Sequence, residues 1–230
     1  CDVLYLSRLC HSRQGPVWVS GCCGSVTSHL LRMLAHLWAD TRISDGVTAR
    51  TLVSGRLPSD ITDLLRELDT EARRTGLPVV AAAGTLLGGT TRVREDVLRI
   101  LLRGTGWPTQ YPQAMFCFWL REEGWLDAVR GEVESANRDW QHELNNLYVS
   151  PHIRRAVLGA DSGLADDEQG VGAVLRSQFP QLTEDIGTVD FPSAARKALS
   201  LDGATPLTLR VLAEVQQYIR QDHHRARTVV

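Results

Sequence analysis

The sequence predicts an α/β fold in which helices flank a parallel β-sheet and a large helical insertion interrupts the sheet-forming parts. Two observations favour this fold. Short apolar runs typical of buried strands lie near both ends of the chain, and the region between them carries several runs of helical periodicity. We therefore expect a single domain over residues 1–230 with residues 91–200 inserted in it, and we expect the chain to be a piece of a longer protein.

The amino-terminal part predicts a strand, a glycine-rich turn and a helix, in that order. Residues 16–20 are short and apolar, as in a buried strand, and residues 28–40 place their leucines on one helix face. Residues 41–57 are polar and contain glycine, so we expect a loop there. A helix over residues 59–75 follows, opened by a proline and stopped by a glycine.

Two further strands and a series of helices complete the expected fold. The run PVVAAA at residues 78–83 is bounded by proline and glycine and predicts a buried strand. The run PLTLRVL at residues 206–212 predicts the last strand, which the helix-like segment AEVQQYIRQ follows. Helical periodicity predicts helices at residues 91–103, 113–133, 139–148, 151–158, 170–179 and 193–199.

The composition argues against several classes of protein. The net charge is −2 at pH 7, so no bulk electrostatic attraction to nucleic acid or to an anionic membrane is expected. No run of about 18 apolar residues is present, which predicts that the chain does not enter a membrane. The five cysteines form no CxxC pair and have no histidine at zinc-ligand spacing, which argues against a zinc site or a disulfide framework and favours the cytoplasm.

A candidate phosphate-binding loop lies between the first strand and the first helix. The P-loop pattern GxxxxGK[ST] uses glycines to wrap the backbone around phosphates, a lysine to contact them and a hydroxyl to bind Mg²⁺. In this chain the pattern aligns with the segment GCCGSVTS. Gly21, Gly24 and Ser28 fit the pattern, whereas Val26 stands at the second glycine and Thr27 at the lysine.

Both departures weaken the predicted site. Loss of the lysine removes a charge-assisted hydrogen bond worth roughly 1.5 to 3 kcal/mol, which is about tenfold to a hundredfold in affinity. The β-branched Val26 tolerates positive φ poorly, and such backbone strain costs on the order of 1 to 3 kcal/mol. The helix N-terminus remains as a weak anion site. From the spacing alone, an ordinary glycine-rich turn between strand and helix is the more frequent alternative.

The end of the last strand offers a partner for this loop. In nucleotide-hydrolysing proteins an apolar strand ends in an acidic pair, in which Asp holds Mg²⁺ and Glu polarises the attacking water. Here the strand ends in Ala213 and Glu214, so only the catalytic carboxylate is present. Arg210 within the strand requires a carboxylate partner or an edge position, because central parallel strands are normally apolar.

Four segments in the same order carry a resemblance to a known family. They are QGPVWVSGCCGSVTSHLLRMLAHLWAD, QYPQAMFCFWLREEGW, ELNNLYVSPHI and PLTLRVLAEVQQYI. They resemble the large P-loop ATPases of bacteriophage-exclusion (BREX) systems, BrxC, and the related phage-growth-limitation protein PglY. The resemblance implies an AAA-like ATPase core within a cytoplasmic protein of phage resistance. In that family the loop reads GSGKSH and the strand ends in Asp-Glu, whereas this chain has GSVTSH and Ala-Glu.

The resemblance implies ATP and Mg²⁺ as cofactors and defines the candidate site. The departures at the lysine and aspartate positions predict weak ATP binding and argue against hydrolysis. The alternative is a non-enzymatic scaffold that keeps the fold, binds no nucleotide and uses the helical insertion for assembly. Expected partners are other phage-defence proteins, further copies of the chain, and DNA through the parent protein. The positions matching the nucleotide site are Gly21, Gly24, Ser25, Thr27, Ser28 and His29, with Ser28 also at the metal position and Glu214 at the catalytic position.

Overall fold

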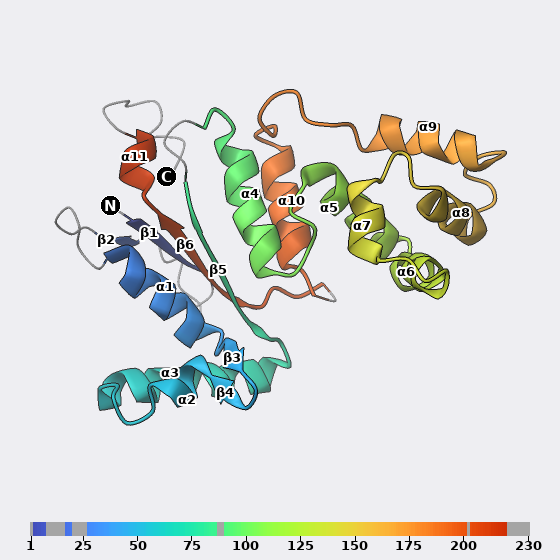
Figure 1. Ribbon diagram of the computed structural model, residues 1–230. Helices are drawn as coiled ribbons and strands as arrows, with labels where there is room; N and C mark the ends of the chain where they lie inside the picture. The colour runs from blue at the N-terminus through green and yellow to red at the C-terminus, as the bar shows by residue number, and fades with distance from the viewer. Residues whose placement is uncertain (1, 8–16, 20–26, 87–89, 202, 220–230) are drawn as a thin grey trace. The chain divides into compact units, whose positions relative to one another are not determined.

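The computed structural model describes residues 2–7, 17–19, 27–86, 90–201 and 203–219, which form a mixed α/β fold (Figure 1). The chain divides into two compact units. The first unit comprises residues 1–105 and 191–230 and contains the sheet, and the second comprises residues 106–190 and is helical. None of the described helices is long and apolar enough to cross a membrane.

A four-stranded sheet forms the centre of the first unit. Its strands are β1 (Asp2–Ser7), β2 (Val17–Val19), β5 (Val79–Thr85) and β6 (Leu207–Ala213), in the spatial order β2-β1-β6-β5. β5 and β6 are parallel, whereas β1 is antiparallel to both β2 and β6. The prediction of a parallel sheet is therefore confirmed only for the pair β5 and β6. The sequence patterns did not predict β1, which is antiparallel to both of its neighbours.

The length of the connection explains why β1 and β2 are antiparallel. Residues 8–16 join the two strands, whereas a parallel crossover needs roughly a dozen residues or more. An antiparallel pair accepts a shorter connection. Because β1 reverses direction between β2 and β6, the three strands β2, β6 and β5 all run the same way.

Strand order explains the burial of each strand. The sequence predicts buried strands at residues 16–20 and 78–83, but Val17 of β2 is 45% exposed and Ala82 is the one fully buried residue of β5. Both strands lie at the edges of the sheet as described, where fewer neighbours cover them. β6 lies inside the sheet and is buried except at Arg210, which is half-buried.

Helix α1 (Thr27–Trp38) covers one face of the sheet and agrees with the predicted first helix. Its apolar side packs on β6, where Leu31 and Ala35 join Leu209 in a buried cluster. Ala81 of β5 packs at the margin of the same cluster. Side chains alternate between the two faces of a strand, so the odd-numbered residues of β5 and β6 face α1.

Helix α4 (Val93–Gly104) covers the opposite face and approaches β5 very closely. A Cβ atom added to Gly104 would lie 2.7 Å from the Cβ atom of Ala82. A Cβ atom on Gly84 would lie 2.4 Å from the side chain of Ile100. Such distances are too short for real side chains, so the two glycines allow helix and strand to approach this closely.

The segment between α1 and the next long helix contains short elements in part of the predicted loop. β3 (Arg42–Ser44) and β4 (Val47–Thr48) form a hairpin, and α2 (Ala49–Leu52) follows directly. The Thr48 side chain accepts a hydrogen bond from the backbone of Thr51 and caps α2. The loop prediction was wrong here because such short polar elements show no periodicity in the sequence.

Three more helices complete the first unit. α3 (Ser59–Thr75) matches its prediction, and Gly76 ends it in the left-handed conformation with φ 68°. α10 (Asp190–Leu199) leads toward β6, and α11 (Val215–Ile219) follows β6 after one residue. The predicted helix-like segment after the last strand is therefore confirmed at residues 215–219, whereas its first residue, Ala213, belongs to β6.

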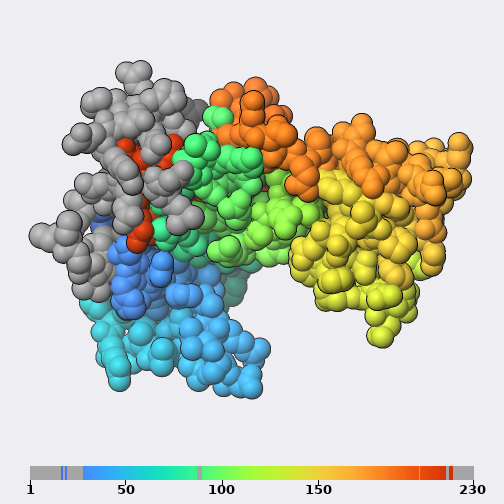
Figure 2. All heavy atoms as spheres, turned by 45° about the horizontal axis from the view of Figure 1, so that its top comes forward, coloured from blue at the N-terminus to red at the C-terminus, as the bar shows by residue number. Residues whose placement is uncertain are grey.

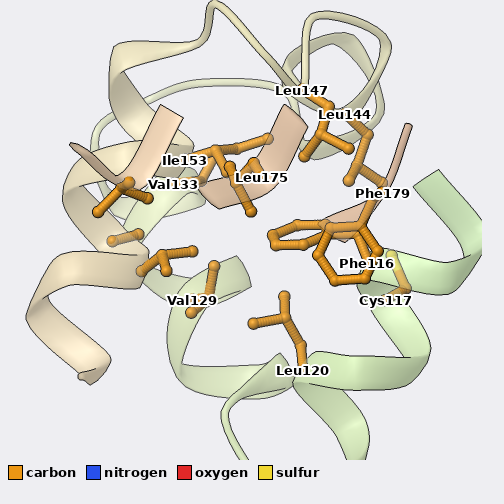
Figure 3. Packing of buried hydrophobic residues seen from close by; sticks show 13 residues of the cluster. Phe116, Cys117, Leu120, Val129, Val133, Leu144, Leu147, Ile153, Leu175 and Phe179 are labelled. Atoms are coloured by element: carbon orange, nitrogen blue, oxygen red, sulfur yellow. The ribbon is translucent and has the colours of Figure 1, made fainter. Parts of the chain in front are cut away.

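The second unit contains five helices around a core of its own (Figure 3). Phe116 and Phe179 meet edge to face in this core, with ring centroids 5.7 Å apart. The predicted helix over residues 113–133 is two helices, because Gly124 breaks the run with φ 75°. Figure 2 draws the atoms of this unit as a closely packed body. The helices are α5 (Tyr111–Glu122), α6 (Leu126–Ser135), α7 (Trp140–Asn145), α8 (Pro151–Ala160) and α9 (Glu168–Gln178).

Candidate functional site

The carboxyl ends of β2, β6 and β5 lie at one edge of the sheet. Val19 of β2 pairs with the first residue of β1, and Leu212 of β6 pairs with the second. On the other side of β6, Ala213 pairs with Thr85, the last residue of β5. Ligands of open α/β sheets bind outside the carboxyl ends of the strands. This edge is therefore the candidate site.

Helix α1 brings part of the predicted loop motif to this edge. Its first half lies beside the end of β5, because an amino group of Arg32 donates a hydrogen bond to Oγ1 of Thr85 at 3.3 Å. Thr27 is the first residue of α1, Ser28 is half-buried and His29 is exposed. The predicted loop residues Gly21, Gly24 and Ser25 and the side chain of Thr27 lie outside the residues that the structure describes.

Glu214 follows β6 directly and has an unusual backbone conformation. Its φ is 59°, and the other described non-glycine residues with positive φ are Asp40 and Asn137. Asp and Asn adopt this conformation more readily than other residues, so Glu214 is the exception. The backbone beside it is held in the sheet, since the Leu86 amide donates to the carbonyl of Ala213 at 3.0 Å. Strained conformations of this kind concentrate at functional sites, and the sequence carried no signal for this one.

Arg210 lies on the strand between β1 and β5, so the edge position considered for it is wrong. It pairs with Tyr5 on one side and Ala82 on the other. Its Nε atom is buried without a hydrogen bond partner, although the residue makes another contact. β6 therefore differs from a typical central parallel strand, which is apolar throughout, because it carries the cationic side chain of Arg210.

The described residues do not supply a Mg²⁺ site. Mg²⁺ is held mainly by carboxylates, water and phosphate oxygens in octahedral geometry. No group of three or more His, Cys, Asp or Glu side chains that could hold a metal occurs in the described parts of the chain. At the expected aspartate position, Ala213 presents a methyl group that is 2% exposed. The described residues therefore do not fit the metal, and we derive no hydrolytic step from their geometry.

A groove that the sequence did not predict lies along the free side of β5. It has a volume of about 590 Å³ and is lined by α1, by β5 and by α4, all within the first unit. Its polar lining includes Arg32 and His36 from α1 and Asp96, Arg99 and Arg103 from α4. The order of strands determines which strand is free, so the sequence pattern of β5 alone carried no signal for the groove.

Comparison with known proteins gives no relative. No protein-family model matches the chain, and neither the curated proteins nor the solved structures give a significant match.

Proposed function

We propose that this chain is a P-loop ATPase-family domain of a phage-defence system whose nucleotide site has degenerated, so that it binds ATP weakly and does not hydrolyse it. The observation that carries the proposal is the shared edge. β2 leads into the glycine-rich segment and α1, β6 ends in Glu214, and both strands have their carboxyl ends at this edge. A phosphate chain bound at the start of α1 would have the Glu214 carboxylate on the same side of the sheet.

The packing of α1 supports the same proposal. A phosphate-binding helix has to be held rigidly behind its loop, because the backbone amides at its N-terminus are aimed at the ligand. Leu31 and Ala35, one and two turns into α1, are buried against β6. Arg32 is hydrogen-bonded to the end of β5 between them. The helix is thus anchored to the strand that carries Glu214.

Three residues account for the proposed degeneration. Thr27 provides no charge at the lysine position, and Val26 stands where a glycine would allow positive φ. Ala213 provides a buried methyl group at the metal position. Loss of the lysine alone corresponds to about tenfold to a hundredfold in affinity. Losing the metal carboxylate removes the group that would hold Mg²⁺ between the phosphates and the protein.

Calorimetric titration tests the proposal. Mg-ATP is titrated into this chain and into the triple variant Val26→Gly, Thr27→Lys, Ala213→Asp. We expect the triple variant to bind at least about tenfold more tightly, because the lysine contact alone contributes that much. The matched control adds Ser28→Ala to the triple variant, which removes the hydroxyl at the metal position and should weaken the restored binding.

Two outcomes contradict the proposal. If the triple variant retains its circular dichroism spectrum but binds Mg-ATP no better than the starting chain, the edge is not a nucleotide site. If the starting chain already binds Mg-ATP as tightly as the triple variant, the nucleotide site is intact and the proposal that it has degenerated is wrong. If the triple variant binds Mg-ATP equally well with and without Ser28→Ala, the Ser28 hydroxyl does not bind the metal.

A non-enzymatic scaffold is the second candidate function. The observation in its favour is that the helical unit, residues 106–190, has a hydrophobic core of its own. A scaffold predicts no change in thermal unfolding when Mg-ATP is added, whereas even weak binding shifts the midpoint at ATP concentrations well above the dissociation constant. Thermal unfolding at millimolar Mg-ATP distinguishes the two candidates.

A further inference from the structure

β5 has one side that is not paired with any strand among the described residues. The Leu86 amide donates to Ala213 of β6, so the even-numbered residues of this segment turn their backbone groups toward β6. The N–H and C=O groups of successive strand residues alternate in direction. Ala81 and Ala83 therefore direct their backbone groups to the unpaired side. A row of unpaired backbone groups is a template for another strand.

The groove follows this unpaired side. It is lined by β5 from Ala81 to Thr85, and α1 and α4 form its two walls. The β5 residues at its base are small, so side chains of this chain do not fill it. Its volume of about 590 Å³ is in the range of sites that hold ligands. The groove thus offers the backbone groups of Ala83 and the amide of Ala81 between two walls, which is the geometry of strand addition. The carbonyl of Ala81 lies close to Gly104 of α4.

The walls of the groove are mainly basic. Arg99 is neutralised by its ion pairs with Glu95 at 2.8 Å and Asp96 at 2.7 Å. Arg103 is exposed and makes no ion pair with any residue that the structure describes. Arg32, on the opposite wall, is bonded to the neutral Thr85 hydroxyl and so keeps its charge uncompensated there. The two walls therefore carry a net positive charge.

We propose that this groove binds an extended acidic peptide of a partner protein, which adds to the unpaired side of β5 as a further strand. The backbone of the peptide pairs with Ala81 and Ala83. Its carboxylates pair with Arg103 on one wall and Arg32 on the other, since side chains of a strand alternate between two faces. A second copy of this chain is disfavoured as the occupant, because it would bring its own arginine-lined walls against these ones. This inference goes beyond the proposed function and does not depend on it.

Peptide binding to the full chain tests the charge part of the proposal. The probe is a fluorescein-labelled peptide of about nine residues, a normal strand length, in which pairs of adjacent glutamates alternate with pairs of valines, so that both faces of the added strand carry carboxylates. The control probe has lysine in place of glutamate. Fluorescence anisotropy should show binding of the acidic peptide alone, and Arg103→Glu should weaken it by about tenfold or more. Arg56→Glu is the matched control, because Arg56 is exposed and does not line the groove.

Hydrogen exchange tests the strand pairing itself. Without peptide, the amides of Ala82 and Gly84 should already be protected by β6, and those of Ala81 and Ala83 should exchange faster. With the acidic peptide, Ala81 and Ala83 should gain protection, which NMR measures residue by residue. A peptide held by arginine side chains alone would leave these amides unchanged, and that result would overturn strand addition.

The remaining outcomes also decide the proposal. Failure of the acidic peptide to bind at millimolar concentration, or equal binding of acidic and basic peptides, overturns it. Self-association of the chain with protection of the same two amides would show that a second copy is the occupant and would overturn it too. Circular dichroism checks the fold of each variant, and Arg32→Glu, on the other wall, provides an independent loss of binding if Arg103→Glu does not fold.

Discussion

An amino group of Arg50 lies 2.6 Å from Oδ1 of Asp69 and joins α2 to α3. The same guanidinium donates to the carbonyl of Leu37 at 2.7 Å and to the carbonyl of Trp38 at 2.8 Å. The Arg50 side chain is only 15% exposed. Arg50, which belongs to α2, thus connects the end of α1 to α3. A residue with fewer hydrogen-bond donors could not make all of these contacts at once.

We expect Arg50→Ala to lower the free energy of unfolding by about 2 to 3 kcal/mol. The substitution removes charge-assisted hydrogen bonds from a shielded position and leaves carbonyls at the end of α1 without this donor. Chemical denaturation followed by circular dichroism measures the change.

Arg66→Ala is the matched control for Arg50→Ala. Arg66 also forms an ion pair, with Asp63 at 2.9 Å, but both side chains are about 70% exposed, at 74% and 69%. Exposed pairs contribute roughly 0 to 1 kcal/mol. An equal decrease in the free energy of unfolding for the two variants would show that the Arg50 contacts stabilise the protein no more than an exposed ion pair does.

Ser150→Ala should destabilise the helical unit by about 2 to 4 kcal/mol. The Ser150 hydroxyl accepts from the Ile153 amide at 3.1 Å and donates to Oε2 of Glu143 at 2.5 Å. Loss of such an N-cap costs about 0.5 to 2 kcal/mol. Glu143 is 6% exposed, so removal of its donor adds the cost of a buried, underbonded carboxylate.

The control for Ser150→Ala is Ser135→Ala. The Ser135 hydroxyl donates to the Glu132 carbonyl at the exposed end of α6 and caps nothing. We expect its effect to stay within about 0.5 kcal/mol. Thermal unfolding followed by tryptophan fluorescence measures both variants, and a similar shift in Tm for the two would contradict the assigned role of Ser150.

The stability of the protein should fall above about pH 9 because of Cys117. Burial raises the pKa of the Cys117 thiol from 9.0 to about 12 and outweighs the charge of Arg130, which lowers it. Between these two values the thiolate forms in the unfolded chain but not in the folded one. Unfolding then releases a proton, so stability is complete below about pH 9 and falls by about 1.4 kcal/mol per pH unit above it.

Cys117→Ala isolates this contribution. The difference in free energy of unfolding between the original chain and the variant should be constant below about pH 8 and should shrink as the pH rises toward 10.5. Other titrating groups, including Tyr111 and Tyr148, are common to both proteins and cancel. If the two curves of unfolding free energy against pH stay parallel up to about pH 10.5, the Cys117 thiol ionises in the folded protein as readily as in the unfolded one.

Local signals account for the successful helix predictions. α3 begins directly after Pro58 and ends at Gly76, as the sequence predicts, because proline and glycine act on the backbone of their own turn. Gly124 shows the same kind of local control, although the periodicity concealed the break between α5 and α6. The short α2 had no such signal, and long-range bonds from Arg50 hold it.

The candidate site was predictable only as a set of residues. The sequence indicates Glu214 directly after an apolar, strand-like run, and it indicates Ser28 at the end of the glycine-rich segment that follows the first such run. The positive φ of Glu214 and the groove beside β5 depend on neighbouring strands and helices, so no pattern within one segment indicates them.

The sequence by itself determined most of the longer helices, the strands β2, β5 and β6, and the residue types at their ends. Backbone propensity and apolar spacing act within a few residues, and this is enough to specify each element. Only the tertiary structure decided that β1 lies antiparallel between β2 and β6, and that one side of β5 pairs with no described strand and has α1 and α4 as walls along it. These features depend on which distant segments pack together, because burial and hydrogen bonding are completed by neighbours far away in the chain.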